Sequence, residues 1–186
     1  MKGLFIKLVI LTSALILFAG CSSSNLTTSK DKGENTSTVS SKTNSKNVKT
    51  IKTFLERELT TTNELKEILN SDDIPAQNQY LKETYGSLIA NEYFEKFVNT
   101  NLGFAVLLPA HSAGYELKPT NMDVQLENSK FNSYTFKAEV ECSKDGKTNT
   151  STITGYMTLN DQGKISGITR FDFNDLQEIF HSAKAK

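Results

Sequence analysis

The stretch that decides the fold is YTFKAEVEC, from Tyr134 to Cys142. Apolar and polar residues alternate along it without a break. Because successive side chains of a β-strand point to opposite faces, this alternation predicts a strand with one buried and one solvated face. The residues expected to point inward are Tyr134, Phe136, Ala138, Val140 and Cys142.

The sequence on both sides of this strand extends the sheet. Asp145 and Gly146 tolerate the positive φ angles of a tight hairpin turn, and Asn160 to Gly163 give a second turn signal. The strands are therefore expected to pair as antiparallel neighbours. The further strands with alternating or continuous apolar residues are Met122 to Glu127, Ile153 to Leu159 and Lys164 to Phe171.

Helices are expected before and after the strands along the chain, because apolar residues recur in these segments at intervals of three and four. Asn63, Asn91 and Asn174 are expected to cap three of them, and Gly86 to end another. Helices followed by an antiparallel sheet predict an α+β domain with a short C-terminal helix. The apolar positions are Ile51, Phe54, Leu55 and Leu59; Leu65, Ile68 and Leu69; Tyr80, Leu81 and Tyr85; Tyr93, Phe94, Phe97 and Val98; and Leu176, Ile179 and Phe180.

The apolar segment from Leu102 to Pro109 has two interpretations. It is either a buried strand or loop that closes the core, which we favour, or an exposed apolar lip on a pocket or partner surface. The sequence does not separate them.

These elements resemble a known superfamily. The runs Phe54 to Leu65 and Tyr80 to Phe97, with the hairpin from Gly155 to Ile165, are similar to small exported domains of the nuclear transport factor 2-like (cystatin-like) superfamily. The resemblance implies a cone in which a bent sheet wraps around helices, with a ligand pocket at the wide end. It implies a fold rather than an activity, because some members are enzymes and many exported ones are binding or assembly modules.

The N-terminus resembles a bacterial lipoprotein signal peptide. Lys2 and Lys7 precede an apolar run that ends at Leu17-Phe18-Ala19-Gly20-Cys21. The resemblance implies removal of residues 1–20, a diacylglyceryl group on Cys21, and membrane lipid as a partner on the outer face of the bacterial cell membrane. Phe18 stands where the family usually has Leu. The alternative is a plain secretory signal cut near Cys21.

Residues 21–49 are predicted to be a lipidated cysteine followed by a flexible tether. The tract is almost entirely polar, so it offers too little apolar surface to offset the entropy of ordering the chain. An alternative is that its Ser and Thr residues are modified or that it threads cell-wall polymer. Residues 50–186 are then one domain by length, and the composition is typical of low-GC Gram-positive bacteria.

Composition argues against several function classes. The chain has 21 basic and 21 acidic residues, which does not favour a nucleic-acid partner. No cluster has metal-ligand spacing, no nucleophile motif appears, and no cofactor is indicated. With Cys21 lipidated, Cys142 stands alone, so no intramolecular disulfide is expected and Cys142 is interpreted as a small buried hydrophobe.

Candidate pocket residues are His111, Tyr115 and Asp123, which flank the entry to the sheet. An imidazole or carboxylate there could act as a general base, although a lone loop histidine is more often solvated or capping another group. Three hypotheses follow: a non-catalytic binding or interaction module in an envelope or conjugation-type assembly, which we favour, a small-molecule enzyme using the cone pocket, or a structural spacer. A protein or small molecule is the ligand expected at the cone.

Overall fold

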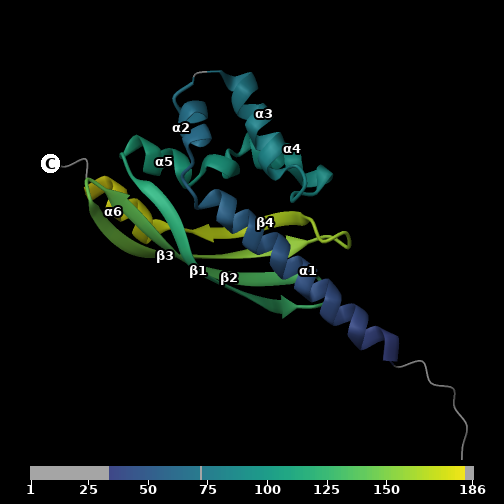
Figure 1. Ribbon diagram of the computed structural model, residues 1–186. Coiled ribbons are helices and arrows are strands. Elements are labelled where there is room, and N and C mark those ends of the chain that lie inside the picture. Colours follow the sequence, from purple (N-terminus) through teal and green to yellow (C-terminus); the bar gives the residue numbers. More distant parts are fainter. Residues whose placement is uncertain (1–33, 72, 183–186) are drawn as a thin grey trace, which may run out of the picture. The chain divides into compact units, whose positions relative to one another are not determined.

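The computed structural model describes residues 34–71 and 73–182, with side chains from residue 44 onward. They form an α+β domain whose antiparallel sheet has the strand order β1-β2-β3-β4 (Figure 1). The predicted fold class and the C-terminal helix are confirmed. The elements are α1 (Glu34–Glu58), α2 (Asn63–Leu69), α3 (Ile74–Tyr85), α4 (Asn91–Asn99), a 3-10 turn η1 (Leu102–Phe104), α5 (Leu107–Ser112), β1 (Glu116–Asn128), β2 (Ser133–Lys144), β3 (Lys147–Leu159), β4 (Ile165–Asp172) and α6 (Asn174–Ser182).

The alternation along β2 sets the register of the sheet. All five residues predicted to point inward are buried, from Tyr134 to Cys142. Phe136 lies opposite Val124 of β1 and Gly155 of β3. Asp145 and Gly146 have φ angles of 51° and 73°, as the predicted hairpin turn requires. The predicted strands are therefore confirmed: β1, β2 and β3 are longer than predicted, and β4 is shifted by one residue.

Gly155 is required by the packing of Phe136. A Cβ atom at Gly155 would lie 2.2 Å from Cζ of Phe136 and 2.5 Å from the Arg170 carbonyl oxygen. The phenyl ring instead reaches Phe171, with ring centroids 5.6 Å apart. A glycine inside a strand thus marks a close approach.

The predicted tether differs from the structure over its second part. Residues 34–49 lie in α1, and Asn47 is fully buried, with Nδ2 donating to the Tyr134 hydroxyl at 3.0 Å. Lys46 Nζ donates to the Gln162 carbonyl, and Thr50 Oγ1 to that of Gly163. These contacts with the sheet stabilise a helix that local composition does not favour. The predicted signal peptide 1–20, the lipidation of Cys21 and residues 21–33 of the tether lie outside the described residues.

The helices α2, α3, α4 and α6 occur where predicted, whereas α5 was not predicted. Three caps differ, one of them because Asn174 is the first residue of α6 rather than the residue before it. Thr62, not Asn63, caps α2 by accepting a hydrogen bond from the Leu65 amide at 3.1 Å. The N-cap of α4 is Ala90, one residue before Asn91, and makes no side-chain hydrogen bond. In the segment 102–109, four residues are buried and Leu108 is 38% exposed, so the segment packs in the core, as favoured. It forms η1 and the start of α5, however, rather than the predicted strand or loop. The four buried residues are Gly103, Phe104, Val106 and Leu107.

The space between the helices and the sheet is filled by aromatic rings. The Phe54 ring centroid is 5.5 Å from that of Tyr85, 6.1 Å from Phe97 and 6.5 Å from Phe171. Buried Cys142 packs in the same core. Side chains therefore occupy the region where the resemblance implied a pocket. Within the described part of the chain, no helix is both long and apolar enough to cross a membrane.

Candidate functional site

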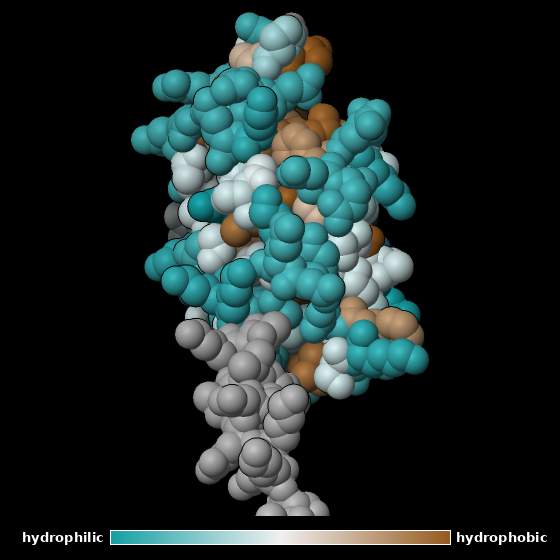
Figure 2. All heavy atoms as spheres, turned by 90° about the vertical axis from the view of Figure 1, so that its right-hand side faces the viewer, coloured by the Kyte–Doolittle hydropathy of each residue, from teal (hydrophilic) through white to brown (hydrophobic). Residues whose placement is uncertain are grey.

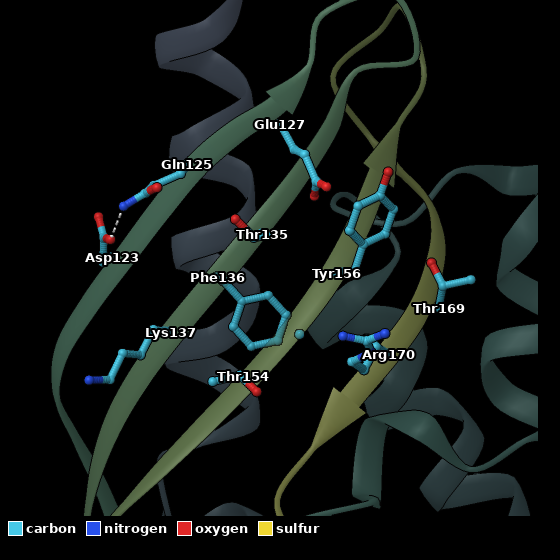
Figure 3. A pocket seen from close by; sticks show the side chains of 11 residues that line it. Asp123, Gln125, Glu127, Thr135, Phe136, Lys137, Thr154, Tyr156, Thr169 and Arg170 are labelled. Atoms are coloured by element: carbon cyan, nitrogen blue, oxygen red, sulfur yellow. Dashed lines mark hydrogen bonds between the residues drawn. The ribbon is translucent and has the colours of Figure 1, made fainter.

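A hollow of about 800 Å³ lies on the face of the sheet opposite α1 (Figure 3). Because side chains of a strand alternate between faces, most of its floor consists of the outward-pointing residues between those of the core, with Phe136 and Gly155 as the two core positions that also border it. Gln125, Thr135, Tyr156 and Arg170 form one row across the four strands. The lining residues are Asp123, Gln125, Glu127, Thr135, Phe136, Lys137, Thr154, Gly155, Tyr156, Thr169 and Arg170.

An irregularity in β4 shapes one wall of this hollow. Tyr156 pairs with Arg170, whereas the next residue of β3, Met157, pairs with Ile168. Thr169 is the extra residue between these pairs, so Thr169 and Arg170 both line the hollow. A bulge of this kind bends a strand and re-aims its side chains.

Both signs of charge are present in the hollow. Asp123 and Glu127 come from β1, while Lys137 and Arg170 come from β2 and β4. Asp123 lies opposite Lys137 in the sheet, and its Oδ2 accepts a hydrogen bond of 2.7 Å from Gln125 Nε2. The hollow therefore offers carboxylates, cations, an amide, hydroxyls and one phenol. Such groups are suited to binding a polar ligand.

The three predicted pocket residues do not form one site. Asp123 lines the hollow, but His111 is in α5, where its Nε2 is 2.9 Å from Asn70 Oδ1. The Tyr115 ring packs on Phe180, and Lys144 Nζ is 5.5 Å from the centroid of that tyrosine ring. Tyr115 and Asp123 are separated by roughly 25 Å of strand, at about 3.3 Å per residue. The position of these residues near the start of the sheet in the sequence therefore did not identify the residues that line the hollow.

A second polar group is buried on the covered face. Glu58, in the last turn of α1, has no exposed surface, and its Oε2 accepts a hydrogen bond of 3.0 Å from the Tyr85 hydroxyl. Burial raises the pKa of the Glu58 carboxyl to about 8, against the opposing effects of hydrogen bonds from Tyr85 and the Val106 backbone. Burial and then the charge of Glu58 raise the pKa of Tyr85 well above its usual value. At neutral pH the carboxyl is therefore mainly protonated.

Neither the hollow nor the buried pair of Glu58 and Tyr85 was predicted from the sequence. The hollow could have been found by following the outward residues of the predicted strands, since Thr135, Lys137 and Tyr156 alternate with core positions. Glu58 offered no such signal, because it lies between Arg57 and Leu59 in a segment that reads as an ordinary amphipathic helix.

Neither arrangement has the form of a metal centre. Among the described residues, no group of three or more His, Cys, Asp or Glu side chains could hold a metal ion. Comparison with known proteins assigns no chemistry either: no protein-family model, no curated protein and no solved structure matches this chain.

Proposed function

We propose that this protein is a lipid-tethered, extracytoplasmic binding module whose ligand surface is the hollow on the open sheet face. The hollow is the observation that carries the proposal. It is large enough for a small polar ligand or a protein side-chain cluster, and it offers both charges on a rigid sheet. The signal-like sequence ending at Cys21 supports the anchor.

The domain is proposed to be a variant of the nuclear transport factor 2-like fold. Supporting this are a long first helix, further helices and a four-stranded antiparallel sheet that curves beside them (Figure 1). The variant uses its sheet differently from the cone that the resemblance implied. Its interior holds aromatic side chains, so the ligand surface is on the outer face of the sheet.

The enzyme alternative has less support. Its best acid is Glu58, but Glu58 and Tyr85 have no exposed surface and lie on the face of the sheet opposite the hollow. A general acid or base must come within hydrogen-bond reach of the substrate. A buried carboxyl in a packed core does not offer that reach.

The spacer alternative is favoured by one observation. The packed interior is what a domain with a purely structural role would have, because stability alone requires a filled core. The spacer and the binding module differ in one expectation: only the binding module has a partner at the open face.

Photocrosslinking in living cells distinguishes these functions. A photoreactive phenylalanine analogue replaces Tyr156 in the full chain, and the matched control carries it at Gln79, an exposed residue of α3. We expect a discrete ultraviolet-dependent adduct at position 156 that Arg170→Ala removes, and none at position 79. Absence of any adduct at position 156 would contradict the binding module and support the spacer.

The anchor is tested separately by cell fractionation. Cys21→Ala should shift the protein from the membrane to the medium or leave an uncut precursor, since Cys21 is the only residue that the signal offers for lipidation. Mass spectrometry of the mature protein should find the lipid on its first residue. A membrane-bound mature chain without acyl groups would contradict the anchor.

A further inference from the structure

The turn between β1 and β2 projects an aromatic and a basic side chain into solvent. Phe131 is 61% exposed, the highest value among the large exposed hydrophobic residues. Lys130 Nζ lies 5.4 Å from the centroid of the Phe131 ring. Leu126, at the end of β1, is 40% exposed. Exposing a phenylalanine at a turn is unfavourable in water unless something covers it.

Hydrogen bonds hold this turn in shape. Asn128 Oδ1 accepts from the backbone amides of Lys130 at 3.0 Å and Phe131 at 3.3 Å. Asn132 then adopts a left-handed conformation, with φ of 46°, and its carbonyl accepts from the Leu159 amide. The turn is thus pre-organised, so ordering it at a surface costs little conformational entropy.

The turn lies at the end of the domain where α1 begins. Asn47 of α1 contacts Tyr134, close to the turn, while Thr61, just after α1, bonds to Leu117 at the start of β1. The helix therefore runs along the sheet, and its first residues extend past the end that carries the β1–β2 and β3–β4 turns (Figure 1). Figure 2 looks onto this side of the molecule, where small brown and tan patches interrupt a mainly hydrophilic surface.

The chain between Cys21 and α1 is short. About twelve residues, 22–33, separate the proposed lipid-bearing cysteine from Glu34. However they are arranged, they span at most ~40 Å. Residues 34–46 of α1 add only ~20 Å of helix. A lipid on Cys21 would therefore leave this end of the domain within ~60 Å of the cysteine, close enough for the β1–β2 turn to touch the bilayer.

We propose that the β1–β2 turn is a second membrane contact, which docks Phe131 and Lys130 into the lipid surface to which Cys21 tethers the chain. This inference rests on the proposed lipid anchor. Phe131 enters the interfacial region, and the Lys130 ammonium stays at the headgroups, as amphipathic side chains do at bilayers. The contact holds the open sheet face in a defined orientation to the membrane.

The contact needs the tether to be effective. Burying one phenylalanine favours the docked state roughly tenfold, which is too weak to recruit a free protein. A tether already holds the turn beside the lipid surface, so the anchor bears the loss of translational freedom and the same contact becomes an intramolecular equilibrium. Charge contributes little, since Glu127 and Asp161 lie at the same end as Lys130 and Lys46.

The absence of tryptophan from the chain permits a direct test. The full-length, lipidated F131W protein is reconstituted into phosphatidylcholine–phosphatidylglycerol vesicles, with or without bromine on the acyl chains. The matched control is I74W, because Ile74 at the start of α3 is 59% exposed. We expect brominated lipid to quench F131W about twofold and blue-shift its emission, and to leave I74W unchanged.

Vesicle flotation separates failure of the contact from failure of the anchor. If the F131W protein floats with the vesicles but is quenched no more than I74W, the turn does not dock and the proposal is overturned while the anchor stands. If the protein does not float, the anchor and the docking both fail. A Cys21→Ala version of F131W from which residues 1–20 have been removed should neither float nor be quenched, since the turn alone binds too weakly.

Discussion

The two faces of the sheet are formed by alternate residues of the same strands, yet they differ in almost every property. On β2, Phe136 and Val140 are buried under the helices, whereas Lys137 and Thr135 are exposed on the open face. The covered face is apolar and filled, and the one acidic residue that is fully buried among those described, Glu58, comes from a helix. The open face is polar and hollowed. Stability is thus concentrated on one face, which leaves the other free to bind.

The strongest test of this difference is Phe136→Ala. Removing a ring that packs on Gly155 and Phe171 should lower the free energy of unfolding by about 3 to 5 kcal/mol, from lost burial and the cavity left behind. The neighbouring Lys137→Ala should change it by less than about 0.5 kcal/mol. Denaturant melts measure both. Equal losses for the two variants would mean that the register of β2 is wrong.

Titration of Glu58 should show that the covered face excludes water. The folded pKa of about 8 exceeds the usual value of 4.5, so the folded protein binds more protons than the unfolded chain between these values. The contribution of Glu58 to the free energy of unfolding should therefore be greatest below about pH 4.5 and should decrease as pH rises towards 8. The loss between pH 5 and pH 7 should be roughly 2 to 3 kcal/mol.

The control for this titration is Glu58→Gln. Its side chain cannot ionise, so the free energy of unfolding of this variant should depend less on pH. Thermal melts across the pH range provide the measurement, with Glu56→Gln as an exposed carboxyl on the same helix. A stability profile of Glu58→Gln that parallels the parent protein would contradict the buried, protonated carboxyl.

The polar contact between α1 and the covered face is expected to have a smaller effect. Asn47→Ala removes a buried hydrogen bond to Tyr134 and should destabilise the domain by about 1 to 2 kcal/mol. Lys49→Ala, on an exposed position of the same helix, should be nearly neutral. A chain beginning at Thr50 should still unfold cooperatively but melt below one beginning at Gly33. Equal melting temperatures would restore the tether boundary predicted at residue 49.

The smallest change in stability is expected on the open face. Arg170→Ala should alter the free energy of unfolding by less than about 0.5 kcal/mol, because its side chain is exposed where it lines the hollow. The same variant should abolish the crosslink from position 156. A large loss of stability in Arg170→Ala would show that the hollow belongs to the structural core instead.

Several features could be predicted because they depend on local patterns. The alternation from Tyr134 to Cys142 indicated which residues of β2 are buried, since a period of two leaves one choice of face. Asp145-Gly146 indicated the hairpin because few residue pairs adopt positive φ angles readily. The positions of α2, α3, α4 and α6 followed from apolar spacing, with errors at caps, where neighbouring polar residues such as Thr62 and Asn63 compete. The first part of α1 and all of α5 were missed.

The sequence by itself determined the α+β class, the inward faces of β2 and β3 and the turns, because these depend on residues close together in the chain. Tertiary structure decided that α1 begins at Glu34, since Asn47 meets Tyr134 across 87 positions of sequence. It also buried Glu58 against Tyr85, filled the expected cone and placed the hollow on the opposite face. Each of these depends on which surfaces meet in space, and burial energies act between surfaces whatever the distance along the chain.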